Sequence, residues 1–271
     1  MTMSRIQTSI HGKHVGLNYD KALQAGEGFV AGEHGNQITL PAPGKVSWFD
    51  DFIGDALDAK YAIVEGTDSA TSDATILSGG IGGVLDILTG DAGTGLAADL
   101  IGVVGPLQWQ ASNGGLVFQA RVKLSAITTC YAFLGFTDVA TLEAPVISAS
   151  GTTFTSNASD AVGFMFDTGM TSDNWWLTGV AANTDATMQD SGFAPVADDY
   201  ATFRIEVNAS GVATFYYNGL QVGTSMTGAV TPATDLCPVL YCSKLSVAAS
   251  MHMYVDYLHV AMTRAADGAA V

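Results

Sequence analysis

Residues 201–223 read ATFRIEVNASGVATFYYNGLQVG and predict three short strands joined by two tight turns. The first seven residues alternate between apolar and polar side chains, the period of two that gives a strand one buried and one solvated face. Residues 208–211 tolerate positive φ, and Asn218-Gly219 is the strongest two-residue hairpin signal in the chain. This part of the chain is therefore predicted to be an antiparallel meander.

The same alternation recurs upstream, over residues 116–125, and a second strand is predicted directly after it, over residues 130–136. These two strands are expected to pair. Further strands, separated by Gly, Asn, Asp and Thr turns, are predicted at 162–167, 174–180, 186–190 and 251–262. Many short strands without sustained helical periodicity predict an all-β fold, a two-sheet antiparallel jelly-roll sandwich.

Composition limits the domain count and the environment. A chain of 271 residues is long enough for one large all-β domain and does not require a second. Hydrophobic residues make up 48% and charged residues 13% of the chain, yet its apolar runs fall short of the roughly 18 residues that a membrane helix needs. No membrane partner is expected. A surface rich in small residues suits a subunit buried in an assembly, and it also suits a monomer.

Charge divides the chain near Lys45. The first 45 residues carry four basic and three acidic groups, and the rest carries six basic and 23 acidic groups, a net charge of −17. Phosphate contacts need a basic surface, so the charge disfavours nucleic acid as a partner of the main domain, and none is expected. The first segment is Gly-rich and ends in LPAPG, which is typical of a linker.

These boundaries predict an extended N-terminal arm over 1–45, a sandwich domain over 46–264 and a tail over 265–271. Two interpretations of the arm remain open, a segment lying along a neighbouring subunit and an edge strand or frayed terminus. The start MTMSRIQTSIHGKH lacks a hydrophobic core segment, so secretion by a signal peptide is not expected. Buried thiols are expected for the three cysteines, with pairing of Cys237 and Cys242 left open.

Six segments carry a family resemblance. They are WFDDFIGDALDAKY (48–61), GGIGGVLDILTG (79–90), GGLVFQARVKL (114–124), VGFMFD (162–167), FRIEVNASGVATFYYNG (203–219) and MYVDYLHV (253–260). Together they resemble concanavalin A-like, laminin-G-like jelly-roll domains, in particular those of tailed-bacteriophage virion structural proteins. The resemblance implies two curved sheets used for carbohydrate binding, for glycan hydrolysis or for attachment to a capsid or tail lattice.

The hydrolase branch can be tested on the residues. Glycan hydrolases of this fold resemble one another in a Glu-x-Asp pattern followed by another Glu on one strand. The reason is that a general acid and a nucleophile must flank one glycosidic bond. The chain has five glutamates, and none lies in such a cluster: Glu27, Glu33, Glu65, Glu143 and Glu206. The acidic residues at 50, 51, 55 and 58 are interpreted as turn-forming and solvated.

Other motifs give little support for a nucleotide, phosphate or metal site. The stretch GTGLAA (93–98) fits a loose dinucleotide pattern, but no acidic residue follows between 100 and 137 to bind a ribose. The glycines at 79–83 lack the Lys-Ser or Lys-Thr of a phosphate-binding loop. His11 and His14 are separated by Gly12, which disfavours a helix that would let them share a metal. His252 and His259 are expected on opposite faces of one strand.

The loop near residue 170 gives the predicted ligand sites. Asp167, Asp173 and Asn174 bracket a loop between strands and offer oxygen ligands of the kind that calcium prefers, with ordinary turn chemistry as the alternative. Trp175 and Trp176 are adjacent, so one indole is expected to point inward and one outward. With Asp173 and Asn174, an exposed indole would contact a sugar or a protein neighbour; the alternative is that both are buried.

The resulting expectation is a non-enzymatic phage virion protein, a capsid decoration or cement protein on the capsid exterior, made in the host cytoplasm. Its expected partners are the major capsid protein and copies of itself. The arm and one sandwich edge would hold it to the lattice through many weak contacts, with four basic residues as arm contacts: Arg5, Lys13, Lys21 and Lys45. The alternative is a carbohydrate- or receptor-binding module of a phage tail or fibre.

Overall fold

The computed structural model describes residues 44–67, 71–78, 82–91, 97–141, 144–245 and 249–264, together with the backbone of 7–10 and 13–16. The chain divides into two compact units, Met1–Ser47 with Thr263–Val271, and Trp48–Met262. In the first unit, β1 (Gln7–Ile10) pairs antiparallel with β2 (Lys13–Gly16). No helix among the described residues is long and apolar enough to cross a membrane.

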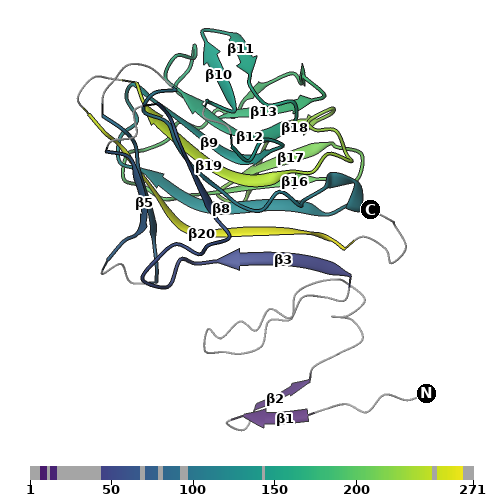
Figure 1. Ribbon diagram of the computed structural model, residues 1–271. Helices are drawn as coiled ribbons and strands as arrows, with labels where there is room; N and C mark the ends of the chain where they lie inside the picture. The colour runs from purple at the N-terminus through teal and green to yellow at the C-terminus, as the bar shows by residue number, and fades with distance from the viewer. Residues whose placement is uncertain are drawn as a thin grey trace. The chain divides into compact units, whose positions relative to one another are not determined.

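The second unit is an all-β sandwich of two eight-stranded antiparallel sheets, as predicted (Figure 1). We call the first the closed sheet, with the order β14-β13-β12-β9-β19-β7-β4 and β15 also paired to β13. Its strands are β4 (Ala62–Glu65), β7 (Ile101–Val104), β9 (Cys130–Thr137), β12 (Ala161–Asp167), β13 (Trp176–Ala181), β14 (Thr184–Asp185), β15 (Gln189–Asp190) and β19 (Cys237–Lys244).

We call the second the open sheet, with the order β18-β17-β16-β8-β20-β6-β5 and β3 paired to β20. Its strands are β3 (Lys45–Asp50), β5 (Asp73–Ile76), β6 (Leu85–Leu88), β8 (Leu116–Leu124), β16 (Ala201–Val207), β17 (Ala213–Tyr217), β18 (Leu220–Met226) and β20 (His252–Thr263). A single turn of 3-10 helix, Ala111–Asn113, precedes β8.

The closed sheet is buried on both faces. Every residue of β9, β12 and β19 is buried. The inner face meets the open sheet through aromatic contacts such as Phe164 with Phe203, whose ring centroids are 5.1 Å apart. The outer face is apolar, and it is covered by a cluster that includes the hairpin of β10 (Ile147–Ser150) and β11 (Thr153–Ser156). Figure 1 shows this hairpin beside β12 and β13.

The open sheet keeps one solvated face. Burial alternates residue by residue along β8 and β16, with the apolar side chains turned to the core. The predicted meander is confirmed, since β16, β17 and β18 pair in sequence. The turn between β17 and β18 uses Asn218 at φ 49° and Gly219 at φ 80°, the left-handed conformations that its residue types favour.

The predicted pairing of residues 116–125 with 130–136 is wrong. β8 pairs with β16 and β20, whereas β9 pairs with β12 and β19 in the other sheet. The five residues between the strands carry the chain from one layer to the other and include Thr129 at φ 47°. Two further predicted strands are shorter than expected, because β13 starts at Trp176 and β15 holds only Gln189 and Asp190.

The prediction that His252 and His259 lie on opposite faces is also wrong. The register of β20 against β8 shifts between Val255 and Tyr257, which is a β-bulge at Asp256. The extra residue moves every later side chain of β20 to the other face. Both histidines therefore lie on the half-buried outer face of the open sheet, as the burial pattern of β20 records.

The cysteines are free and buried. Cys130, Cys237 and Cys242 form no disulfide, so the pairing that the sequence left open does not occur. Burial raises the pKa of Cys130 and of Cys237 to about 12, which keeps both thiols protonated near neutral pH. They act as small core residues.

Candidate functional site

The two predicted tryptophans lie inside the fold. Trp175 is 2% exposed, with its ring centroid 4.6 Å from that of Phe203 and 5.6 Å from that of Phe166. Trp176 is half-buried, packs on Phe154 of β11, and donates a hydrogen bond from Nε1 to the Ser172 carbonyl at 3.3 Å. Trp175 thus offers no surface to a ligand, and Trp176 is partly covered by the hairpin.

Asn174 is held by an acidic neighbour on β15. Its Nδ2 donates to both carboxylate oxygens of Asp190, at 2.9 and 3.1 Å, and Asp190 also accepts from Ser172 Oγ and from the Gly192 amide. Asp173, which lies between Ser172 and Asn174 in the sequence, is exposed. Desolvation raises the pKa of Asp190, but the hydrogen bonds outweigh it and hold this pKa below its usual value. The loop is tied to β15 by one carboxylate.

Asp190 should stabilise the fold in a pH-dependent way. Because the pKa is depressed in the folded state, the contribution is present above the unfolded pKa of about 3.9 and is lost as pH falls through the folded value. Asp190→Asn should therefore cost stability near neutral pH, with the difference from wild type shrinking below about pH 4. Urea unfolding of both proteins across this pH range measures it; a constant difference would contradict the assignment.

Asp167 is a buried structural carboxylate. It is 2% exposed and accepts hydrogen bonds from the amides of Gly169 at 2.7 Å and Ala149 at 3.2 Å. Burial raises its pKa, and the two amide donors reduce that rise. Asp167 and Asn174 thus have separate partners. No group of three or more His, Cys, Asp or Glu side chains in the described part of the chain is arranged to hold a metal.

The arm residues give no site. Arg5 and Lys21 lie outside the described residues, Lys13 is described only as backbone of β2, and Lys45 is an exposed residue at the start of β3. His11 and parts of the glycine-rich stretches 79–83 and 93–98 also lie outside the described residues. The lattice-contact role of these residues stays a prediction.

A hollow of about 380 Å³ lies between the loop after β3 and the turn after β5. Its lining includes Ile53, Asp55 and Leu77. The aromatic ring in its wall, Phe52, is 2% exposed, and one carboxylate is the only charged group among the lining residues. It therefore offers a ligand few hydrogen-bonding side chains.

The outer face of the open sheet is where polar and aromatic side chains gather. We call it the polar face, and its residues are Gln119, Arg121 and Lys123 of β8, Arg204 and Glu206 of β16, Tyr216 of β17, and Tyr254, Asp256, Tyr257 and His259 of β20. All ten are neither fully buried nor fully exposed. The sheet register sets them in rows across the strands, because side chains on one face of paired strands stand opposite one another.

One row is joined by hydrogen bonds around Gln119. Its Nε2 donates to the Tyr257 hydroxyl at 2.7 Å, and its Oε1 accepts from Arg204 Nη1 at 3.1 Å. Arg204 also pairs with Glu206, its Nη2 lying 2.6 Å from Oε1. These contacts fix the side chains in place before any ligand arrives, which lowers the entropic cost of binding.

In a second row, basic side chains lie over aromatic rings and make cation–π contacts. Tyr200, from the loop before β16, lies beneath the Arg121 guanidinium at 4.3 Å and near the Lys123 ammonium at 5.2 Å. Lys123 also lies 4.7 Å from the Tyr254 ring centroid, and Arg121 pairs with Asp256 at 2.6 Å. Such cation–π contacts stabilise exposed rings by about 0.5–1 kcal/mol each.

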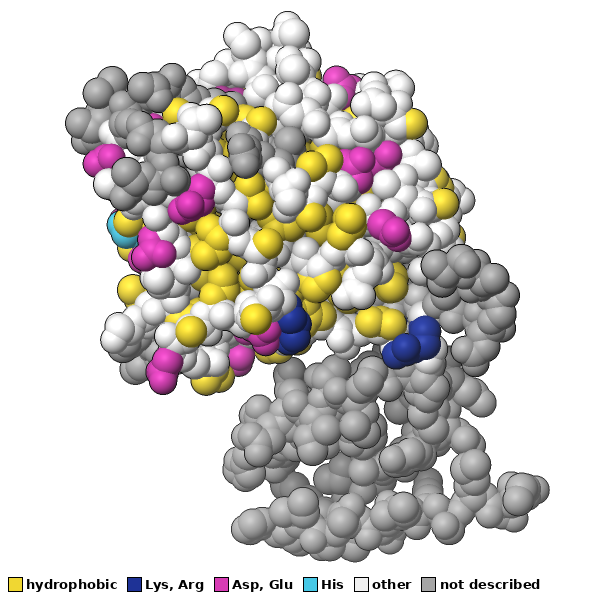
Figure 2. Space-filling model, viewed as in Figure 1, with side chains coloured by type: hydrophobic (Ala, Val, Ile, Leu, Met, Phe, Trp, Pro, Cys, Tyr) yellow, Lys and Arg dark blue, Asp and Glu magenta, His cyan; other side chains and the backbone are white. Residues whose placement is uncertain are grey.

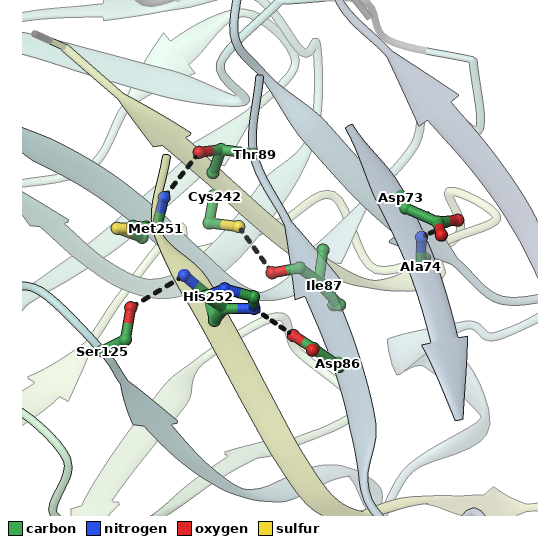
Figure 3. Close-up of polar contacts among 9 residues, drawn as sticks. All are labelled: Asp73, Ala74, Asp86, Ile87, Thr89, Ser125, Cys242, Met251 and His252. Carbon is green, nitrogen blue, oxygen red and sulfur yellow. Dashed lines mark hydrogen bonds and ion pairs between the residues drawn. The ribbon is translucent and has the colours of Figure 1, made fainter. Parts of the chain in front are cut away.

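The row continues to the edge of the sheet through His252. Its ring lies parallel to that of Tyr254, with centroids 5.4 Å apart and an interplanar angle of 1°. Figure 3 shows the His252 ring pointing across to Asp86 of β6, with Nδ1 2.8 Å from Oδ1, while its backbone amide donates to Ser125 Oγ. In the same view, Thr89 Oγ1 accepts from the Met251 amide. We call the rings of Tyr200, Tyr254 and His252 the platform; the Asp86 carboxylate lies at its His252 end.

At the other side of the face, Phe49 of β3 is 59% exposed and stacks on Tyr257, with ring centroids 5.9 Å apart. His259 lies beside it, 6.3 Å from the Phe49 ring. Burial lowers the pKa of His259 and the nearby Arg204 charge lowers it further, so this imidazole is neutral at pH 7 and can both donate and accept. The polar face thus combines exposed rings with fixed donors and acceptors.

The described strands hold no pair of carboxylates. Each carries at most one Asp or Glu, so no strand repeats the Glu-x-Asp arrangement of a glycan hydrolase. On β12, the outward positions Ala161, Gly163 and Met165 are apolar or lack a side chain, and the fourth, Asp167, is the buried carboxylate held by the Ala149 and Gly169 amides. The polar and aromatic side chains that a ligand could reach gather instead on the polar face of the open sheet.

Comparison with known proteins gives the fold. No family model and no curated protein matches the chain in sequence. Among solved structures, a Bacillus licheniformis β-glucanase is 10% identical, with a TM-score of 0.53 over 79% of this chain and 97% of that one. A Bacteroides ovatus glycoside hydrolase family 16 endo-glucanase is 12% identical, with a TM-score of 0.53 over 79% and 99%.

Two further solved structures have the same sandwich. A protein of unknown function from Shewanella oneidensis MR-1 is 12% identical, with a TM-score of 0.52 over 84% of this chain and 90% of that one. The Crh5 transglycosylase is 13% identical, with a TM-score of 0.52 over 81% and 85%. The chain therefore has a concanavalin A-like jelly-roll fold.

These comparisons correct the predicted function. The similar structures named here are two glucanases, a transglycosylase and a protein of unknown function. The expectation of a non-enzymatic capsid decoration protein is therefore wrong. It assigned to this chain the function of one group of proteins that share the fold, and a shared fold does not fix a function. A capsid partner, self-association and a virion location stay predictions.

The sequence analysis missed the polar face. Its residues are outward side chains of three stretches that were used only to recognise strands, 116–125, 201–223 and 251–262. Polar residues that alternate with apolar ones read as an ordinary solvated strand face. The signal that could have found part of the site is Tyr254, an aromatic residue at an outward position of β20, whereas Tyr257 joins this face only through the bulge.

Proposed function

We propose that this chain binds carbohydrate on the polar face of its open sheet. The proposal rests mainly on one observation: the Lys123 ammonium lies near two aromatic rings, those of Tyr200 and Tyr254. The C–H faces of a sugar pack on aromatic rings, while its hydroxyls need nearby donors and acceptors. A preformed row of rings between charged and amide side chains meets both needs.

Three further observations support the proposal. The outer face of the closed sheet is filled by apolar side chains and covered, so the open sheet provides the accessible strand face within the described residues. The side chains of the polar face are already held by hydrogen bonds and ion pairs. The fold is shared with proteins whose names describe action on glucans. A half-exposed sheet face that is not an enclosed pocket suits an extended chain of sugars better than a single small molecule.

The test is a binding panel of soluble polysaccharides, measured by affinity electrophoresis and then by calorimetry on the best ligand. Tyr254→Ala and Tyr200→Ala should each weaken binding about tenfold, which is about 1.4 kcal/mol. Phe193→Ala is the matched control, because Phe193 is 40% exposed and stacks on Tyr217 away from the polar face. It should bind like wild type.

Three outcomes would contradict the proposal. The first is that no polysaccharide of the panel is retarded by the wild-type protein. The second is that the Tyr254 and Tyr200 variants, shown to be folded by circular dichroism, bind as tightly as the Phe193 variant. The third is that all three folded variants lose binding, because the ligand would then not depend specifically on the polar face.

A further inference from the structure

Carboxylates surround the aromatic rings of the polar face. Burial raises the pKa of the Tyr254 hydroxyl, and the negative charges of Asp86 and Asp198 raise it further. Burial likewise raises the pKa of Tyr200, and Asp256 adds to that rise against the opposing effect of Arg121. The contacts place these carboxylates directly. Asp256 pairs with Arg121, whose guanidinium lies 4.3 Å from the Tyr200 ring centroid. Asp86 contacts His252, whose ring is parallel to that of Tyr254, and the Asp198 amide donates to the Leu124 carbonyl at the end of β8.

The two arginines of the same face are already paired with carboxylates. Arg121 is paired with Asp256 and Arg204 with Glu206, each at 2.6 Å. Lys123 has its ammonium near the rings of Tyr200 and Tyr254, at 5.2 and 4.7 Å. Binding of an acidic sugar group needs a cation, or better a pair of cations, that is free to form charge-assisted hydrogen bonds. Here a ligand anion would have to compete with protein carboxylates for both arginines.

The wider surface adds to this effect. Residues after 45 carry six basic and 23 acidic groups. Acidic side chains are scattered over the face drawn in Figure 2, with exposed hydrophobic atoms between them. At physiological ionic strength the Debye length is about 8 Å, so the acidic groups next to the platform act on a ligand while distant ones are screened. At low salt all of them repel an anionic polymer.

We infer that the polar face takes polysaccharides without acidic groups and discriminates against anionic ones. This inference rests on the proposed carbohydrate binding and names its ligand class. Discrimination of this kind works by placing like charges where the wrong ligand must sit. Lys123 then donates to sugar hydroxyls, and the carboxylate of Asp86 accepts from them.

The test uses polymers that share a backbone and differ in charge. The pairs are hydroxyethylcellulose with carboxymethylcellulose, methyl-esterified pectin with polygalacturonate, and dextran with dextran sulfate. Binding is measured in about 0.01 M and about 1 M salt, where the Debye length is about 30 Å and about 3 Å. In any pair that binds, the neutral member should bind at least about tenfold more tightly at low salt, and the gap should narrow at high salt.

Charge-removing variants locate the effect. Asp198→Asn should raise the affinity for the acidic member of a bound pair at low salt and leave the neutral member nearly unchanged. Asp185→Asn is the control, because it removes the same charge from β14 at the far edge of the closed sheet. It should change neither affinity by a comparable amount.

The outcomes separate the two proposals. Binding to no member of any pair overturns the carbohydrate proposal and this inference with it. Binding of an acidic member as tight as or tighter than its neutral partner at low salt overturns this inference alone. Equal effects of the Asp198 and Asp185 variants would assign the discrimination to net charge and overturn the role given to the platform.

Discussion

Replacing Trp175 by alanine should destabilise the domain by about 3–5 kcal/mol, the usual cost of truncating a fully buried large aromatic residue. Its side chain is 2% exposed and packs between Phe166 and Phe203, so truncation leaves a cavity at the contact of the two sheets. Its Nε1 has no hydrogen-bond partner among the described residues, so the cost comes from packing and lost apolar burial. Urea unfolding at constant pH measures the change.

The adjacent residue is the control for this prediction. Trp176 is the same residue type at the next position but is half-buried. Trp176→Ala should therefore lower the free energy of unfolding by only about 1–2 kcal/mol. Both variants should keep the urea dependence of wild type, which would show that the unfolded state is unchanged. Equal costs for the two variants would mean that the burial difference between neighbouring indoles does not exist in solution.

The pair also shows what local sequence can decide. Alternation along a strand correctly places one indole inward and one outward. It does not reveal that β11 lies over the outward one, because Phe154 and Trp176 are 22 positions apart in the sequence and meet only through the hairpin. Alternation therefore predicts toward which face each indole points, but it does not predict how much of the indole is exposed to solvent. The exposed area decides whether an indole can bind a ligand.

The wrong prediction that β8 and β9 pair in one sheet has a related reason. β8 and β9 are close in sequence and both apolar on one face, which favours pairing on proximity alone. The difference between them was visible, since β9 (CYAFLGFT) has no charged residue while β8 alternates with Gln119, Arg121 and Lys123. A strand without an alternating polar face belongs in a layer covered on both sides. Weighing this contrast would have separated the two sheets.

The bulge in β20 could not be predicted. Nothing in MHMYVDYLHV marks Asp256 as an extra residue, because Asp is also common at ordinary solvated positions. The bulge follows from the pairing with β8, where Val255 and Tyr257 stand opposite Val122 and Arg121. One inserted residue brings Tyr257 and His259 onto the face that Tyr254 already occupies. The polar face therefore depends on a tertiary feature, although its meander and its fold class were predictable.

Substituting Gly135 by alanine should destabilise the domain by at least about 3 kcal/mol, at or above the upper end of the usual cost of overpacking. Gly135 lies in the middle of β9, opposite Gly163 of β12 and Val239 of β19. A Cβ there would lie 2.1 Å from the Val162 carbonyl oxygen and 2.6 Å from the Gly163 Cα. Both are backbone atoms of a paired strand, so no side-chain rotation relieves the contact and the sheet itself must shift.

Gly219→Ala separates this steric effect from the general cost of replacing glycine. Gly219 has φ +80° in the turn between β17 and β18, and no atom lies within 4 Å of its would-be Cβ, so the substitution should cost only about 1–2 kcal/mol of left-handed strain. Chemical denaturation of both variants gives the two values. If Gly135→Ala were no more costly than Gly219→Ala, β9 and β12 would be free to separate. The closed sheet would then lack the rigidity that lets it support the open sheet and its polar face from behind.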